Sequence, residues 1–286
     1  MQHAEGKIRV LIQNLSTEID GGRYNSKRTV GEPFEVKADI YGDGHDKIRA
    51  VLRYRSPDTK GWQETAFEAL PNDRWSASFT PATQGHYTYT IHAWVDHLST
   101  WYEKFKKKQA AGLYLEVELQ EGVQLLQKVS SKLGKKQAKA LQPAIDKLAD
   151  RKQYEDAVHY VISAEFEELI TQHPLKANET RYPAELGLRV ERSKALYSTW
   201  YEFFPRSAAA EPGQHGTFKD CERLLPRVAA MGFDVLYFPP IHPIGEEHRK
   251  GINISVTSQP GEPGSPLAIG SKEGGHKSIH KALGTL

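Results

Sequence analysis

The sequence has little cysteine and no marked excess of charge of either sign. Its 286 residues include one cysteine, Cys221, which alone can close neither an intramolecular disulfide nor a cysteine-based zinc site. The 38 Lys and Arg against 36 Asp and Glu give a formal net charge of +2, which provides no broad basic surface. Because nucleic acids and anionic membranes are bound through such surfaces, we expect neither as a partner.

Long apolar runs are absent as well. Met1 to Val10 contain no apolar stretch of signal-peptide length. With 26% charged residues and a mean hydropathy of −0.59, the composition argues against an integral membrane protein, while 38% hydrophobic residues suffice for buried cores. We therefore expect a globular, cytoplasmic protein, and the length favours two or three domains.

Residues 8–98 show the alternation of apolar and polar side chains that is typical of β-strands. In the run 34–42, Phe34, Val36, Ala38 and Ile40 fall on one face. Five further runs, at 8–16, 48–56, 62–70, 74–80 and 86–99, alternate in the same way with turn residues between them. Six short strands indicate a β-sandwich, and we assign residues 1–98 to an amino-terminal sandwich of immunoglobulin-like type.

The apolar spacing changes to three and four residues between 99 and 173, which predicts helices. Breaks near Gly112, at 134–143 and at 150–151 divide this region into four helices, which we assign to a helical bundle inserted over residues 99–180. Two apolar stripes support the assignment: Val123, Leu126, Val129 and Leu133, and then Val158, Val161, Ile162, Phe166, Leu169 and Ile170. The lysine cluster at 104–108 is more simply explained as a solvated helix face than as an anion-binding patch.

The remaining chain first returns to strand and then changes pattern. Residues 181–193 contain the apolar run 186–190, which we expect to rejoin the sandwich. From residue 194 the order is an apolar run at 195–204, a helix at 217–231 and a strand at 234–238, a β-α-β pattern. The helix is expected to bury Phe218, Cys221, Leu225 and Val228 and to end before Gly232.

Four segments of this last region carry a resemblance to a known family: LYSTWYEFFPRS, GTFKDCERLLPRVAAMGFDVLYFPPIHPIG, RKGINISV and GEPGSPLAIGSKEGGHKSIHKALGTL. They resemble the entry into the catalytic barrel of the α-1,4-glucan:maltose-1-phosphate maltosyltransferases of the α-amylase superfamily. The regions before them resemble that family's sandwich with its helical insertion. The implied fold is multidomain, with residues 194–286 as the first β-α-β of an incomplete (β/α)8 TIM barrel.

The resemblance implies transfer of maltosyl from maltose 1-phosphate to the non-reducing end of an α-1,4-glucan. Such retaining chemistry needs a nucleophilic carboxylate and an acid/base carboxylate. In this superfamily these follow the fourth and fifth barrel strands, and a third, stabilising carboxylate follows the seventh. This chain ends after about two strands, so we expect no catalytic residue in it, and no cofactor or metal. A homodimer formed through the sandwich and the helical insertion is the expected assembly.

The resemblance carries two substrate-binding residues onto this sequence, Lys250 and Asn253. The family's Lys-Gly-x-Asn-Asn loop, which lies by the donor maltosyl group, reads here Lys250, Gly251, Ile252, Asn253 and Ile254. Isoleucine replaces the second asparagine and offers no hydrogen bond to a sugar.

A second departure lies in the family's Gly-Ser-Pro-Trp-Ala-Ile-Gly loop, where Leu267 replaces the tryptophan. The aromatic ring that could pack near a sugar is therefore lost at this position.

Other candidate groups have simpler explanations. His276 and His280 are four residues apart but lack the glutamate of HExxH and a third ligand, so we expect no metal site there. The glycine-rich segment 261–275 contains no phosphate-binding motif and is predicted to be a loop. Cys221 lies on an apolar stripe, which favours core packing over a nucleophile. His242 lies between prolines and is expected to shape the loop after the second strand.

Two alternatives to the enzyme remain open, a non-catalytic dimerisation module and an α-glucan-binding module. The second would use Trp62, Trp75, Trp94 and Trp101 as a platform on which sugars stack. Aromatic residues at alternating strand positions more often belong to the core, so core packing is the favoured interpretation.

Overall fold

The chain divides into two compact units, residues 1–192 and 193–286, which are described separately. The computed structural model describes residues 8–285, with the backbone alone at residues 177 and 178. Within this described part, no helix has the length and apolar character needed to cross a membrane.

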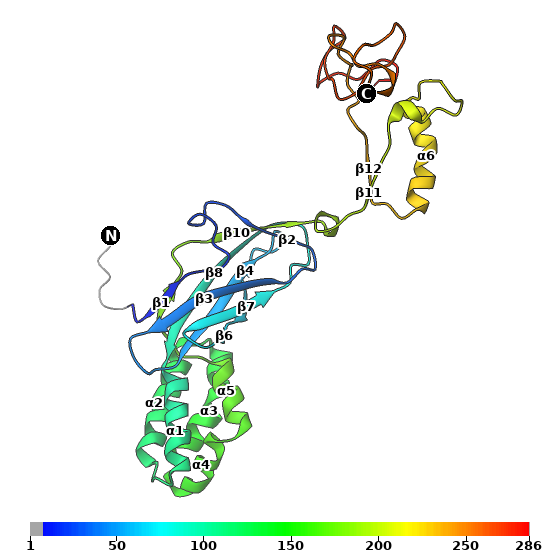
Figure 1. The fold of residues 1–286 in the computed structure, drawn as a ribbon. Helices are drawn as coiled ribbons and strands as arrows, with labels where there is room; N and C mark the ends of the chain where they lie inside the picture. Colours follow the sequence, from blue (N-terminus) through cyan, green and yellow to red (C-terminus); the bar gives the residue numbers. More distant parts are fainter. Residues whose placement is uncertain (1–7, 286) are drawn as a thin grey trace. The chain divides into compact units, whose positions relative to one another are not determined.

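The first unit contains two sheets (Figure 1). One has the order β1 (Val10–Gln13), β3 (Phe34–Gly42), β7 (Arg74–Phe79), β6 (Glu68–Ala69). The other has the order β2 (Ser26–Thr29), β10 (Leu186–Glu191), β8 (Gly85–Asp96), β4 (Ile48–Arg55), β5 (Gln63–Ala66), and β9 (Lys176–Arg181) also pairs with β8. All neighbouring strands are antiparallel except β2 and β10, which are parallel.

The two sheets share one hydrophobic core. The alternation predicted for β3 is confirmed, because Phe34, Val36, Ala38 and Ile40 are all buried. They belong to one cluster with residues of the other sheet, and the Phe34 ring meets the Tyr89 ring edge-on with centroids 5.1 Å apart. Burial of each large side chain contributes about 1.5–3 kcal/mol, so this face holds the sheets together.

Four strand predictions need correction. The assignment of 99–180 to helices is wrong at its end, because residues 176–181 form strand β9, which pairs with β8. The run 62–70 is two strands, because β5 pairs with β4 and β6 pairs with β7 in the other sheet, with buried Phe67 between them. The run 86–99 ends as strand at Asp96, where a helix begins. Strand β2 was not predicted, since its sequence SKRT lacks apolar alternation; it forms through its pairing with β10.

Five helices follow β8: α1 (His97–Ala110), α2 (Glu116–Lys132), α3 (Lys135–Ala149), α4 (Tyr154–Val161) and α5 (Ala164–Gln172), with a 3-10 turn at Arg151–Gln153. Four helices were predicted. The missed break lies after Ile162, where the Ser163 hydroxyl accepts a hydrogen bond from the Phe166 N–H and caps α5. The predicted break at 134–143 was too long, because α3 begins at Lys135 and continues through the exposed Pro143.

The helices pack around a second hydrophobic cluster that includes Trp101, Phe105 and Phe166. Gly122 of α2 allows this packing, because a Cβ placed there would lie 2.4 Å from the Trp101 ring. Trp94 and Trp101 are 2% and 3% exposed, which confirms core packing for them and makes the proposed four-tryptophan platform wrong.

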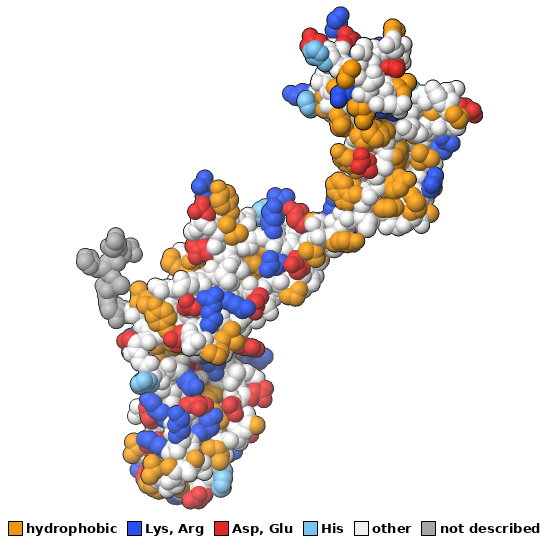
Figure 2. All heavy atoms as spheres, in the orientation of Figure 1, with side chains coloured by type: hydrophobic (Ala, Val, Ile, Leu, Met, Phe, Trp, Pro, Cys, Tyr) orange, Lys and Arg blue, Asp and Glu red, His pale blue; other side chains and the backbone are white. Residues whose placement is uncertain are grey.

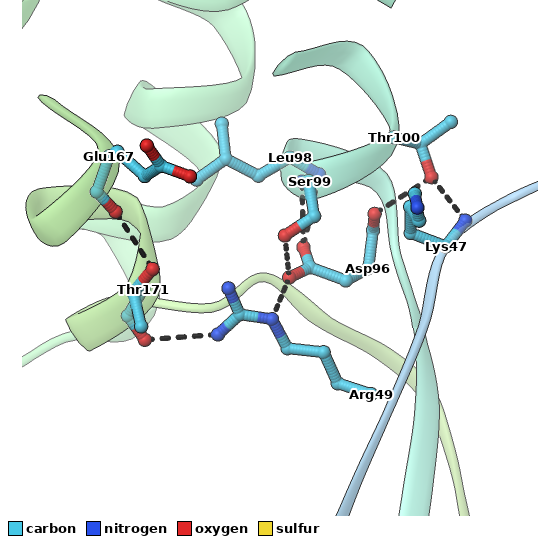
Figure 3. Close-up of polar contacts among 8 residues, drawn as sticks. All are labelled: Lys47, Arg49, Asp96, Leu98, Ser99, Thr100, Glu167 and Thr171. Atoms are coloured by element: carbon cyan, nitrogen blue, oxygen red, sulfur yellow. Dashed lines mark hydrogen bonds and ion pairs between the residues drawn. The ribbon is translucent and has the colours of Figure 1, made fainter. Parts of the chain in front are cut away.

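Asp96 joins β8 to the first helix (Figure 3). Its fully buried carboxylate accepts hydrogen bonds from the backbone N–H groups of Leu98 and Ser99, at 3.1 and 3.2 Å, and caps α1. Arg49 of β4 pairs with the same carboxylate at 2.8 Å and donates to the Thr171 carbonyl of α5 at 3.0 Å. One buried carboxylate and one arginine thus connect two strands with the first and last helices.

The second unit contains a pair of parallel strands, β11 (Trp200–Glu202) and β12 (Val235–Tyr237), connected through α6 (Phe218–Ala230). Thr217 and Asp220 form a capping box at the start of α6. Cys221 and Val228 are buried as expected, but Leu225 is 44% exposed, so its predicted burial was wrong.

Apolar side chains are exposed around this strand pair. Figure 2 shows them as the orange surface near α6. Trp200 and Tyr237 lie on the strands themselves and are 59% and 43% exposed. A two-stranded sheet with one crossover helix cannot bury both of its faces, which accounts for this exposure.

Candidate functional site

The second unit holds a cavity of about 640 Å³ that contains both residues predicted to bind substrate. Lys250 and Asn253 line it together with residues of the glycine-rich segment 261–275 and of the segment that follows β11. The full lining is Phe204, Arg206, Lys250, Gly251, Ile252, Asn253, Ile254, Pro263, Gly264, Ser265, Pro266 and Leu267. The size falls within the range of small-molecule sites.

The backbone of residues 250–255 is tightly turned. Gly251 donates its N–H to the Ser255 carbonyl at 2.9 Å, and a Cβ at Gly251 would lie 2.6 Å from the backbone carbonyl oxygen of Thr257, so glycine is needed there. Asn253 and Ile254 both have left-handed backbone angles, with φ of 54° and 62°. Asparagine tolerates this conformation, whereas β-branched isoleucine is strained in it.

Two arginines connect the loops around the cavity. Arg249 donates to the carbonyls of Gly245 at 2.9 Å and Ile244 at 3.2 Å. Arg206 donates to the Gly264 carbonyl at 2.7 Å. Arg249 therefore closes the turn at 244–249, and Arg206 connects the segment after β11 with the loop at Gly264.

The lining combines three kinds of group. Lys250 and Arg206 supply positive charge, the Asn253 amide supplies a donor and an acceptor, and the Phe204 ring with the prolines supplies apolar surface. This combination suits a sugar phosphate, since cations bind phosphate, amides bind hydroxyls and apolar groups cover the ring faces. Ile254 and Leu267, the two departures from the family pattern, lie at the same cavity and are both 73% exposed.

Four of the five histidines of this unit form two pairs, neither of which joins His276 with His280. His280 stacks on His215 with ring centroids 5.4 Å apart, and burial, followed by the charge of His215, lowers the pKa of His280. His276 lies beside His242, whose Nδ1 is 2.9 Å from the Ser278 carbonyl. Among the described residues, no three His, Cys, Asp or Glu side chains gather closely enough to hold a metal ion.

Cys221 and the glycine-rich segment have structural roles. Cys221 is 3% exposed, and burial raises the pKa of its thiol, which disfavours the nucleophilic thiolate. Gly264, Gly270 and Gly274 have positive φ angles, as tight turns require, and Ser271 and Gly274 bond to each other across one such turn.

Phe204 and Arg206 were not predicted as site residues. They follow β11 and reach the cavity through a short 3-10 turn at Pro205–Ser207. The sequence shows them only as part of an apolar and basic segment, FFPRS, more than forty residues before Lys250, and no spacing rule joins the two. Their position at the carboxyl end of a predicted strand was the available signal, because loops there carry the sites of parallel α/β folds.

Comparison with known proteins places the whole chain beside one group. Residues 8–192 match the family model described as α-1,4-glucan:maltose-1-phosphate maltosyltransferase, domain N/S. The curated relatives carry the name α-1,4-glucan:maltose-1-phosphate maltosyltransferase. The protein of Methylacidiphilum infernorum is 42% identical over 283 residues, and that of Chlorobaculum tepidum is 43% identical over 282 residues. Each alignment covers 99% of this chain and 42% of the relative.

A third relative, from Pseudomonas aeruginosa, is 40% identical over 286 residues, which cover 96% of this chain and 41% of that protein. The chain therefore spans about two-fifths of the length of the curated relatives it matches.

Proposed function

The chain belongs to the α-1,4-glucan:maltose-1-phosphate maltosyltransferase family, and we propose that it forms the amino-terminal part of an enzyme that transfers maltosyl from maltose 1-phosphate to the non-reducing end of α-1,4-glucans. The observation that carries this proposal is the alignment of 99% of the chain, sandwich, helices and loops together, with relatives named for that activity. A module serving only dimerisation or glucan binding would not account for similarity that continues through residues 193–286.

The proposal extends to the architecture. We take residues 1–98 and 181–193 as an immunoglobulin-like sandwich, and residues 99–180 as its helical insertion, whose last residues return to the sheet as part of β9. We take residues 194–286 as the start of a (β/α)8 barrel. The two sheets with one core support the first part. The parallel pairing of β11 and β12 across α6 supports the last, because a crossover helix between parallel strands is the repeating unit of such barrels.

Lys250 and Asn253 are the proposed substrate-binding residues, in the cavity they share with Phe204 and Arg206. In this assignment Lys250 and Arg206 neutralise the phosphate of the donor, and Asn253 exchanges hydrogen bonds with sugar hydroxyls. Binding of the leaving phosphate by fixed cations would favour cleavage of the glycosidic bond, since negative charge develops on that oxygen.

None of the carboxylates in this chain is proposed to be catalytic. Retaining transfer needs two carboxylates about 5–5.5 Å apart across the scissile bond, and the superfamily places them after later barrel strands. The reaction is acid–base and nucleophilic chemistry at a single carbon, so the proposal includes no metal and no cofactor.

The expected assembly is a homodimer formed through the sandwich and the helices, with no nucleic-acid or membrane partner. Apolar side chains exposed on the sandwich, among them Ile19 and Tyr24, support a surface of that kind. A cytoplasmic site of action fits the donor, because a charged sugar phosphate does not cross membranes unaided.

Phosphorus NMR tests the cavity directly. Adding residues 1–286 to maltose 1-phosphate is expected to broaden and shift the phosphate resonance, and free maltose is expected to compete only weakly. Lys250→Ala removes one charged contact and is expected to weaken binding about tenfold. The matched control is Lys272→Ala, which removes an exposed lysine of the same unit outside the cavity lining. Equal effects of the two substitutions, or none from either, would contradict the assignment.

A further inference from the structure

A second cavity, of about 310 Å³, lies in the helical part of the first unit. It is formed by the start of α2 and by the corner between α3 and α4, at the end of the helices away from the sheets (Figure 1). Its lining joins aromatic, amide, carboxylate and guanidinium groups: Tyr114, Glu116, Leu119, Gln120, Val123, Gln124, Leu148, Ala149, Asp150, Arg151 and Tyr154.

An exposed aromatic ring stands at this cavity. Tyr114 is 70% exposed although it stacks on Tyr154, with ring centroids 4.8 Å apart and an interplanar angle of 28°. The Tyr154 hydroxyl accepts a hydrogen bond from the Leu115 N–H at 3.0 Å, and this bond fixes the Tyr154 ring under that of Tyr114. One face of Tyr114 is therefore held against the protein and the other is open, a geometry suited to stacking on a flat apolar surface.

Polar groups follow the same helix in a row. Glu116, Gln120 and Gln124 are four residues apart on α2, so their side chains lie one above another on one face. The Tyr114 hydroxyl donates to the Glu116 carboxylate at 3.1 Å, and Arg151 lies 3.6 Å from that carboxylate. These contacts orient the carboxylate while the two amides each offer a donor and an acceptor.

The floor of the cavity is apolar. Leu119 and Leu148 are buried there, 5% and 4% exposed, and Val123 packs against the same core. An apolar floor, one open aromatic face and a rim of amides and carboxylates match a pyranose ring, which has apolar C–H faces and hydroxyls around its edge. A phosphate would meet Glu116 and Asp150 as well as Arg151, so the charges do not favour an anion.

We propose that this cavity binds a glucose unit of a neutral α-1,4-glucan chain, as a carbohydrate subsite separate from the cavity at Lys250. The open face of the Tyr114 ring, the amides beside it and the opposed charges support a neutral sugar as the ligand. The choice of an α-1,4-glucan rests on the proposed function. Such a subsite would hold a long glucan on the protein.

Affinity electrophoresis tests this inference. Residues 1–286 are run in native gels that contain glycogen, with dextran and plain gels beside them. Retardation is expected in glycogen only. Tyr114→Ala removes the open ring and is expected to weaken the apparent affinity about tenfold, while Tyr114→Phe keeps the ring and most of the affinity. Gln120→Ala is expected to weaken binding less, and Gln127→Ala, an exposed glutamine of the same helix outside the cavity lining, is the matched control.

The outcomes separate this site from the other cavity. Retardation that survives Lys250→Ala but is lost in Tyr114→Ala supports the helical subsite, whether or not maltose 1-phosphate binds at Lys250. Retardation lost in Lys250→Ala alone, or absent from the unsubstituted chain, would overturn the inference. Equal retardation in dextran would refute the α-1,4-glucan assignment. Thermal unfolding followed by circular dichroism checks that Tyr114→Ala, a change at an exposed side chain, leaves the helices folded.

Discussion

Replacing Asp96 by alanine is expected to destabilise the first unit strongly, since that side chain has four partners and no exposure. The carboxylate accepts from the Leu98 and Ser99 N–H groups, from the Ser99 hydroxyl at 2.6 Å and from Arg49 at 2.8 Å. Loss of a helix cap costs about 0.5–2 kcal/mol, and leaving one member of a buried ion pair without its partner costs about 3–5 kcal/mol. Arg49 keeps 27% exposure and its bond to Thr171, so we expect the lower end of the ion-pair cost, about 3 kcal/mol, and about 4 kcal/mol in all with the lost cap.

Urea unfolding followed by tryptophan fluorescence measures this loss. Four of the five tryptophans lie in the first unit, and Trp200→Phe as background removes the remaining signal of the second. Asp96→Asn keeps a cap acceptor but loses the charge, so about 1–2 kcal/mol is expected. Arg49→Met in each background completes the double-mutant cycle. If Asp96→Ala cost less than about 1 kcal/mol, or the cycle showed no coupling, the carboxylate would not be the junction described above.

Three further expectations concern strain, pH and packing. Ile254→Asn should stabilise the second unit by about 1 kcal/mol by relieving the left-handed backbone, measured as a higher urea midpoint by circular dichroism; an unchanged midpoint would contradict the strain. Burial lowers the pKa of His92 below its ordinary 6.5 in spite of the opposing effect of Glu179, 3.2 Å away, so the unfolded chain takes up the proton first and stability should fall as pH drops through about 6.5. His92→Gln should flatten that pH dependence, and an unaltered profile would assign it to other groups. Gly122→Ala should destabilise the helices by about 1–3 kcal/mol through its clash with Trp101, whereas a neutral effect in thermal unfolding would show that the ring moves aside.

The spacing of apolar residues predicted those strands and helices whose apolar side chains enter a core. Alternation identified β3 because every second side chain of 34–40 enters the shared core. Strand β2 has no such pattern and forms only because β10, far along the chain, pairs with it. The single apolar run 62–70 could not reveal that its two halves join different sheets. These failures share one cause, since pairing partners distant in sequence decide them.

The candidate site shows the same division. Lys250 and Asn253 were predicted from the resemblance of their loop to the family's Lys-Gly-x-Asn-Asn motif, and both line the cavity. Phe204 and Arg206 join them only through folding of the loops, held in part by the bond from Arg206 to Gly264. The strain at Ile254 was also beyond sequence pattern, because it depends on a backbone angle rather than on residue type.

Phosphate release from maltose 1-phosphate in the presence of glycogen measures whether the catalytic carboxylates lie outside residues 1–286. Residues 1–286 are joined to the remainder of the Chlorobaculum tepidum relative, with which they share 43% identity, and compared with residues 1–286 alone. We expect the joined protein to release phosphate as glycogen lengthens and residues 1–286 alone to release none. Phosphate release with glycogen lengthening by residues 1–286 alone, or none from a folded joined protein, would contradict it.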